Sequence, residues 1–168
     1  SSDLDALWKG LEAGEIQIVA TDHCPFNYAK EKQDGKDDFR KCPNGAPGVE
    51  ERMILLFSEG VMKNKISINK LVEVACTNPA KVYGMYPKKG IIEPGADGDL
   101  IIIDADAKQT LTHEMMHGAV DYTSYEGTPL NGKIDLVMQR GNIIAENNEF
   151  KGNRGDGQYI YRKPYFDI

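Results

Sequence analysis

The sequence predicts the closing unit of an α/β domain followed by part of a separate β domain. Three observations support this order: a short β-branched run at residues 16–21, two helical patterns after it, and strand and turn signals from about Pro87 onward. The expected division is therefore residues 1–86, residues 87–150 and a tail over residues 151–168. A chain of 168 residues is ordinarily one domain or two small ones.

The first expected elements are a helix between Ser2 and Gly14 and a strand at residues 16–21. The apolar residues of the helix recur at helical spacing and would share one face: Leu4, Leu7, Trp8 and Leu11. The strand is apolar on both faces, as expected for a buried parallel strand. Residues 27–47 show no periodicity, which predicts a loop of a length that is usually functional.

Two helical segments are expected after the loop. The first covers residues 48–61, with two acidic residues in its first turn, where negative charge is favourable. The second is capped by Ser67, and Asn78-Pro79 is expected to break it before a short helix that ends at Gly84.

The β unit is expected to contain a strand at residues 99–104 and a hairpin. The hairpin joins residues 134–139 to residues 142–146 through Arg140-Gly141. The tail has no clear period but contains four aromatic residues: Tyr159, Tyr161, Tyr165 and Phe166. Aromatics without a local core are typical of an interface, so we expect a subunit contact, with folding back onto the β unit as the alternative.

Composition excludes several classes of protein. The formal net charge is -6 and the 20 Lys and Arg are scattered, which argues against nucleic-acid or anionic-membrane partners. No apolar run approaches the roughly 18 residues that span a bilayer, and the acidic N-terminus is not expected to be a signal peptide. The first residue is not Met, so the chain is expected to be processed or an excerpt. The three cysteines form no Cys-x-x-Cys pair and predict free thiols in a reducing cytosol.

Asp22 is the strongest candidate for chemistry. The apolar run at residues 16–21 ends in Asp22-His23 and is then broken by Pro25, which predicts a carboxylate at the C-terminal end of a strand. In α/β barrels this end of the strands is where catalytic groups lie. An Asp in this position can equally cap a turn or a helix, and the spacing alone leaves both possibilities open.

A second motif, His113-Glu114-x-x-His117, matches the helix motif of zinc proteases. The longer form of that motif fails, because Val120 occupies the required Gly position and Thr123 the next ligand position. The motif also lies among expected strands, and one isolated helical turn is a poor platform for two metal ligands. A zinc protease is therefore kept only as a remote alternative.

An ordered set of motifs resembles the dihydropyrimidinase and hydantoinase branch of the cyclic amidohydrolases. The segments that carry the resemblance are Thr21-Asp22-His23-Cys24-Pro25-Phe26, Lys36-Asp37-Asp38-Phe39, Cys42-Pro43-Asn44-Gly45, Asn78-Pro79-Ala80-Lys81 and Pro94-Gly95-Ala96-Asp97-Gly98-Asp99. The resemblance implies the C-terminal part of a (β/α)8 TIM barrel, namely its last strand and helices, followed by part of a small β-sandwich. A whole barrel needs about 250 residues, so most of the barrel would lie outside this chain.

The resemblance implies a metal-dependent hydrolase that opens dihydropyrimidine or hydantoin rings to N-carbamoyl amino acids. It implies two divalent metal ions, zinc being the expected metal, with most ligands absent from this chain. Asp22 would be a metal ligand and proton shuttle, and Asn44 with Gly45 would bind the cyclic substrate. It also implies a cytoplasmic homo-oligomer, a dimer or tetramer, acting in pyrimidine catabolism. The 168 residues alone are expected to be inactive.

Two related alternatives remain open. Some relatives of these enzymes are non-enzymatic scaffold proteins, and others open dihydroorotate or allantoin rings. The presence of Asp22, and of Asn44-Gly45 in the following loop, favours an enzyme. His23 is expected to be structural rather than a metal ligand, and nothing marks Cys24 as a nucleophile.

Overall fold

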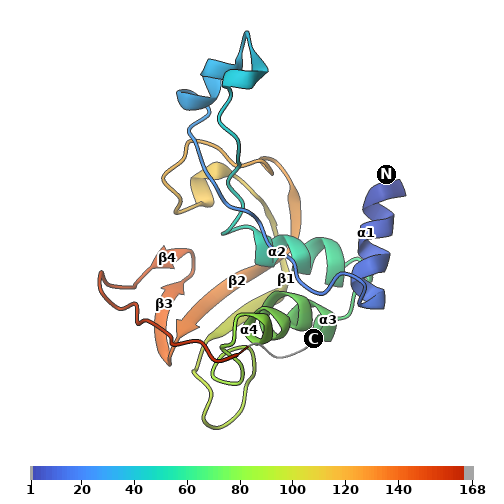
Figure 1. Ribbon diagram of the computed structural model, residues 1–168, viewed down its shortest axis with the longest axis vertical. Coiled ribbons are helices and arrows are strands. Elements are labelled where there is room, and N and C mark those ends of the chain that lie inside the picture. The colour runs from blue at the N-terminus through green and yellow to red at the C-terminus, as the bar shows by residue number, and fades with distance from the viewer. Residues whose placement is uncertain (1, 165–168) are drawn as a thin grey trace.

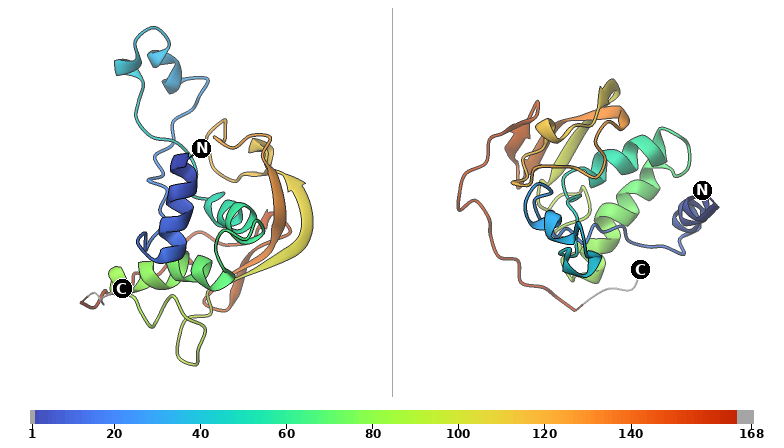
Figure 2. Two further views of the ribbon diagram at one scale, coloured as in Figure 1. Left: turned by 90° about the vertical axis from the view of Figure 1, so that its right-hand side faces the viewer. Right: turned by 90° about the horizontal axis from the view of Figure 1, so that it is seen from above.

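A computed structural model describes residues 2–164, and it places helices against one face of a four-stranded antiparallel sheet (Figure 1). The strands are arranged in the order β1-β2-β3-β4. A long excursion between α1 and α2 projects away from this body, and α1 lies on the far side of the other helices from the sheet (Figure 2). The order of helices before strands agrees with the sequence.

Helix α1 spans Ser2–Ala13, as its apolar spacing predicts. Gly14 adopts a φ of 79° and ends the helix, because its N–H bonds back to the carbonyl of Leu11. Leu11 is buried, whereas Leu4 and Leu7 remain about half exposed. The apolar face of α1 is therefore only partly covered within the described chain.

The strand expected at residues 16–21 does not form, and this prediction is wrong for the chain by itself. The segment pairs with no strand among residues 2–164 and bonds to helices instead. Val19 donates its N–H to the carbonyl of Val74 at 3.2 Å, and Asn78 donates its side-chain amide to the carbonyl of Gln17 at 2.9 Å. A parallel strand needs a neighbouring strand for its ladder, and the described strands all belong to the antiparallel sheet.

The excursion over residues 27–47 is a loop, as predicted, and contains two short 3-10 helices. These are η1 (Glu31–Gly35) and η2 (Phe39–Lys41). The side chain of Asp38 accepts the N–H of Arg40 and so caps η2. The loop therefore has local structure of its own at its outer end.

The first helical segment after the loop begins later than expected. It comprises α2 (Arg52–Leu55), which continues directly into the π-helical turns of η3 (Leu56–Val61). The sequence predicted a start at residue 48, but the N–H groups of Gly48 and Val49 donate to a side chain outside the helix. The N–H groups at these two positions therefore form a tertiary contact and not a helical turn.

The second helical segment is continuous, so the predicted break at Asn78-Pro79 is wrong. Its parts are α3 (Ile68–Val72), η4 (Glu73–Thr77) and α4 (Asn78–Val82). Ser67 caps its start as predicted, since its hydroxyl accepts the N–H of Lys70 at 3.0 Å. Pro79 has no N–H to donate, and the wider π-helical turn of η4 directly before it accommodates the missing bond.

The strands are β1 (Leu100–Thr110), β2 (Pro129–Gln139), β3 (Asn142–Glu146) and β4 (Glu149–Phe150). The hairpin between β2 and β3 is confirmed, with Gln139 facing Asn142 across a two-residue turn. Arg140 and Gly141 have φ values of 48° and 81°, the positive angles that a tight hairpin turn requires. β1 and β2 are both longer than predicted.

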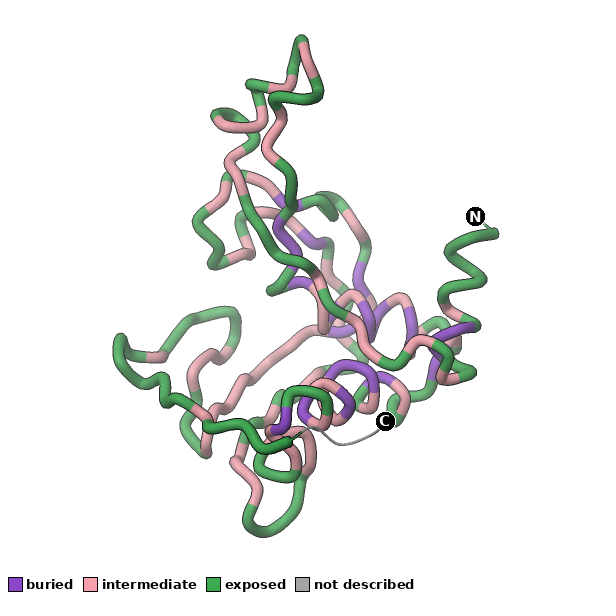
Figure 3. The backbone as a smooth tube through the Cα atoms, in the orientation of Figure 1, coloured by how far each residue is buried: buried purple, intermediate pink, exposed green. Residues whose placement is uncertain are grey.

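One hydrophobic core joins the helices to the sheet (Figure 3). Its most buried large side chains include Leu71, Val74 and Leu111. On β2, Gly132 has a φ of 107°, and a Cβ there would lie 2.7 Å from the ring of Phe57. The lack of a side chain at this position lets η3 pack closely on the sheet.

Two predictions from composition can be compared with the structure. The three cysteines are free thiols, as expected. No helix within residues 2–164 has the length and apolar character needed to cross a membrane.

The tail lies along the outside of the molecule. The N–H of Lys163 donates to the carbonyl of Gly84 at 2.9 Å, and a Cβ at Gly84 would clash with the carbonyl of Lys163. Tyr159 and Tyr161 stack edge to face with ring centres 4.9 Å apart, and both are largely exposed. The other two aromatics of the expected contact, at positions 165 and 166, lie outside the described residues.

Candidate functional site

Two predicted site segments lie side by side, although a long loop separates them in the sequence. The N–H of Cys24 donates to the carbonyl of Ala46 at 3.2 Å. The ring Nδ1 of His23 accepts the N–H groups of Gly48 at 3.2 Å and of Val49 at 3.3 Å. The structure therefore brings the segment that contains Asp22 against the segment that contains Asn44 and Gly45.

Asp22 follows the segment at residues 16–21 and has an exposed side chain. Its φ of 48° lies in the left-handed region, which Asp and Asn tolerate better than other residues with a Cβ. Its carboxylate accepts no hydrogen bond from residues 2–164, so within the described chain it does not serve as a turn or helix cap. The carboxylate is thus available to an external group.

The close contact between the two segments requires a glycine at position 45. Its φ is 114°, and a Cβ on it would lie 2.3 Å from the carbonyl oxygen of Cys24. Only a residue without a side chain allows this approach at this angle. Asn44, directly before it, is exposed.

Lys32 supports the same loop and was not singled out from the sequence. Its ammonium donates to the carbonyl oxygens of Pro43 and Gly45, each at 2.6 Å, and so brackets Asn44. The ammonium also lies 5.7 Å from the ring centre of Phe26. One lysine among many in a charged loop has no local signal that would distinguish it.

Asp121 anchors the beginning of the loop to the connection between β1 and β2. Its carboxylate accepts the N–H groups of Tyr28 at 2.6 Å and Ala29 at 2.9 Å. These backbone donors, that of Ala29 first, hold the pKa of Asp121 below its ordinary value. The rings of Tyr28 and Tyr122 pack beside this bond, 5.8 Å apart. A pairing across more than ninety residues cannot be inferred from either local sequence.

Arg52 lies behind the segment that leads to Asp22. Its guanidinium donates to the carbonyl of Val19 at 3.3 Å. Its buried Nε has no hydrogen-bond partner within residues 2–164. Buried donors are rarely left unpaired, so this atom faces a position where a further acceptor is needed.

The His113-Glu114-x-x-His117 motif does not form a metal-binding helix. Its first residues form a single 3-10 turn, η5 (His113–Met115), and His117 lies beyond that turn. The ring Nε2 of His113 bonds to the carbonyl of Val120 at 2.6 Å. The two histidines are thus not presented on one helical face, as the protease motif requires.

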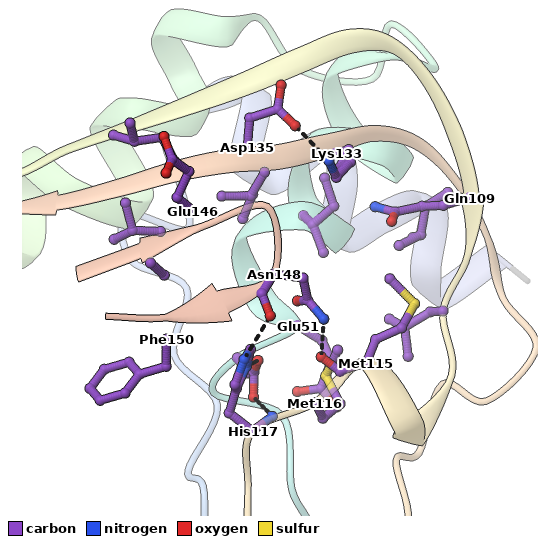
Figure 4. A pocket seen from close by; sticks show the side chains of 18 residues that line it. Glu51, Gln109, Met115, Met116, His117, Lys133, Asp135, Glu146, Asn148 and Phe150 are labelled. Carbon is purple, nitrogen blue, oxygen red and sulfur yellow. Dashed lines mark hydrogen bonds and ion pairs between the residues drawn. The ribbon is translucent and has the colours of Figure 1, made fainter. Parts of the chain in front are cut away.

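His117 instead links the segment after the site loop to the β3–β4 turn (Figure 4). Its Nδ1 lies 2.6 Å from the carboxylate of Glu50, and its Nε2 lies 3.1 Å from the carbonyl of Asn148. The same carboxylate accepts the backbone N–H of His117 at 2.9 Å. Because both ring partners are acceptors, the protonated ring is favoured, and the bond to Glu50 raises the pKa of His117 above its ordinary value.

We expect this contact to make stability depend on pH. A raised folded-state pKa stabilises the protein below the unfolded-state pKa, and that contribution is lost as pH rises through the folded-state pKa. The melting temperature of the wild type minus that of His117→Gln should therefore be larger at about pH 6 than at about pH 9. Glu50→Gln should remove the same pH-dependent contribution, so its melting temperature should also fall further below that of the wild type at the lower pH. A difference that stays constant with pH would contradict the assignment.

A cavity of about 360 Å³ lies beside His117, between β2 and the turn at Met115 and Met116 (Figure 4). Most of its lining is apolar. Glu51, 3% exposed, is one of its lining residues, and the carboxylate of Glu51 accepts a hydrogen bond from the hydroxyl of Thr123 at 2.6 Å. Asp22, Asn44 and Gly45 do not line this cavity, so it is separate from the Asp22 segment.

The described residues do not assemble a metal site by themselves. Within residues 2–164, no group of three or more His, Cys, Asp and Glu side chains could hold a metal ion. The structure thus supplies one exposed carboxylate, that of Asp22, from the predicted set. Any ion bound there would need further ligands from outside these residues.

Comparisons with known proteins cover almost the whole chain. Residues 1–144 match the family model described as "Amidohydrolase family". The chain is similar to a D-phenylhydantoinase of Escherichia coli, with 45% identity over 161 residues, which is 96% of this chain and 35% of the relative. It is similar to a D-hydantoinase of Streptomyces coelicolor, with 43% identity over 94% of this chain and 33% of that protein.

Solved structures of a dihydropyrimidinase and an L-hydantoinase also match almost the whole chain. A dihydropyrimidinase from Brevibacillus agri superposes with a TM-score of 0.95 and 42% identity, over 98% of this chain and 36% of that one. An L-hydantoinase from Arthrobacter aurescens superposes with a TM-score of 0.85 and 36% identity, over 93% of this chain and 34% of that one. The chain therefore spans about a third of the length of the relatives that it matches.

Proposed function

Because this chain belongs to the amidohydrolase family, we propose that it is the C-terminal portion of a hydantoinase or dihydropyrimidinase that hydrolyses cyclic amide bonds. The observation that carries this proposal is the 45% identity to a D-phenylhydantoinase across 96% of the chain. The family resemblance inferred from the ordered motifs is confirmed. The chain retains both segments that the motifs single out, and the structure holds them together.

We assign residues 1–86 to the end of a TIM barrel, residues 87–150 to part of a β-sandwich and residues 151–168 to a tail. The segment at residues 16–21 supports this division, because backbone groups of Ile16, Gln17 and Val19 bond to residues of helices. A barrel strand packed against helices in this way needs neighbouring strands on its flanks. These would come from the part of a longer protein that this chain does not include.

The donor chemistry at Asp22 fits a divalent metal ion. An exposed carboxylate without a protein partner is a suitable ligand, and a two-ion site would need additional ligands from a longer chain. When bound, two divalent ions, with zinc as the expected metal, would activate water and polarise the substrate carbonyl. Asp22 would contribute one ligand to this group.

Asp22 has a second role in the proposed reaction. The oxygen of water adds to the ring carbonyl carbon while the carboxylate of Asp22 accepts its proton. The ring C–N bond then breaks, and Asp22 returns the proton to the departing nitrogen, so that an N-carbamoyl amino acid is released. The exposed loop at Asn44 and Gly45 would hold the ring through its backbone, beside this carboxylate.

The proposal is tested by comparing the intact protein that contains this chain with the 168 residues alone. The intact protein should hydrolyse hydantoin and dihydrouracil and should contain bound metal, as measured by absorbance and by elemental analysis. The isolated chain should do neither. Exclusive turnover of dihydroorotate or allantoin would replace the substrate assignment. An intact protein without hydrolysis or metal would be a scaffold, and two tightly bound ions on the isolated chain would contradict the proposed ligand set.

We further propose that the intact protein is a homo-oligomer to which the tail contributes a contact. Tyr159 and Tyr161 are 78% and 86% exposed, which is a large apolar area to leave in water. Ending the intact protein after Phe150 should reduce the mass measured by light scattering to that of a smaller assembly. Ile92→Ser, at a similarly exposed position outside the tail, is the control and should leave the mass unchanged. An unchanged mass after truncation would refute the contact.

A further inference from the structure

We infer that His23 is a positioning residue that fixes the loop of Asn44 and Gly45 against Asp22. This inference rests on the proposed function and adds a residue to it. His23 follows Asp22 directly in the chain, and its ring reaches the far end of the opposite segment. The ring therefore connects the proposed proton shuttle to the proposed substrate loop.

The hydrogen bonds determine which ring nitrogen is the acceptor. Nδ1 of His23 receives two backbone N–H groups, from Gly48 at 3.2 Å and Val49 at 3.3 Å. A nitrogen that accepts these bonds uses its lone pair and has no proton of its own. The neutral ring must then hold its proton on Nε2. His23 thus acts through Nδ1 as a fixed acceptor for the loop.

Gly48, the more buried of the two donors, needs this acceptor, whereas Val49 is 51% exposed and its N–H can also reach water. Gly48 is buried, and it precedes the first residue of α2, so no helical carbonyl is available to its N–H. An unpaired N–H in a buried residue is costly, because water cannot replace the lost partner. The loop would therefore shift toward solvent if the ring acceptor were removed.

A second contact makes the attachment rigid. Cys24, the residue after His23, donates its N–H to the carbonyl of Ala46, and Gly45 packs so closely on Cys24 that a Cβ there would lie 2.3 Å from the Cys24 carbonyl oxygen. Two attachments on adjacent residues fix both the distance and the rotation of the loop relative to Asp22. Small displacements of positioned groups have large effects on substrate binding and on rate.

Two variants of the intact protein separate the acceptor from the bulk of the ring. His23→Asn keeps an acceptor oxygen near the position of Nδ1, whereas His23→Leu keeps volume without an acceptor. We expect His23→Leu to raise KM for hydantoin by about tenfold while kcat changes less, because the loop and not the carboxylate is displaced. His23→Asn should stay within about threefold of the wild type in both constants.

Hydrogen exchange supplies a readout that does not depend on activity. The amides of Gly48 and Val49 should exchange about tenfold faster in His23→Leu than in the wild type, and His23→Asn should restore their protection. Unchanged protection in His23→Leu would overturn the inference, as would an Asn variant as defective as the Leu variant. Faster exchange with an unchanged KM would show a structural role only and would also overturn it. Absence of hydrolysis in the wild type would instead refute the proposed function.

Discussion

Replacing Asp22 with Asn is expected to lower kcat of the intact protein by about a thousandfold, because the amide can neither accept nor return the proton. The substitution isolates chemistry from folding. Asp22 has a φ of 48°, and Asn tolerates this region as well as Asp does. Its carboxylate is exposed and accepts no hydrogen bond from residues 2–164, so no described contact is lost.

Elemental analysis of the same Asp22→Asn protein should show reduced metal occupancy, because a neutral amide is a weaker ligand than a carboxylate. The matched control is Asp37→Asn, which removes an exposed charge from the neighbouring loop and should leave kcat and metal content unchanged. If Asp22→Asn retains kcat within about tenfold of the wild type, or about 1.4 kcal/mol of barrier, Asp22 is not the proton shuttle.

Replacing Gly45 with Ala is expected to lower kcat/KM by about a hundredfold, through two effects of one methyl group. The first is backbone strain at a φ of 114°, of about 1 to 2 kcal/mol. The second is overlap, because the new Cβ would lie 2.3 Å from the carbonyl oxygen of Cys24. That oxygen belongs to the backbone and cannot rotate away, so the two site segments must separate.

Gly95→Ala is the control that separates these two effects. Gly95 has a φ of 99°, but a Cβ on it would meet nothing within 4 Å. It should therefore lower the melting temperature through strain alone and leave kcat/KM unchanged. Equal losses of activity in the two variants would show that the contact between Gly45 and Cys24 does not matter for the site.

The sequence by itself determined the features that depend on short-range rules. The hairpin at Arg140-Gly141, the Ser67 cap and the Gly14 stop each follow from the conformations or hydrogen bonds of a few neighbouring residues. The ordered motifs identified the family. They also selected Asp22 and the loop of Asn44 and Gly45 as the candidate site, through a resemblance rather than through geometry.

Only the tertiary structure decided how these pieces are joined. The segment at residues 16–21 has the composition of a strand but does not form one. A strand needs a neighbouring strand for its hydrogen-bond ladder, and the described chain provides none beside this segment. Helix α2 begins later than the sequence predicted, because the N–H groups of Gly48 and Val49 donate to the ring of His23. Asp121 bonds to the loop across more than ninety residues. Such bonds join residues that only the tertiary fold brings together, and no local sequence pattern predicts which residues these are.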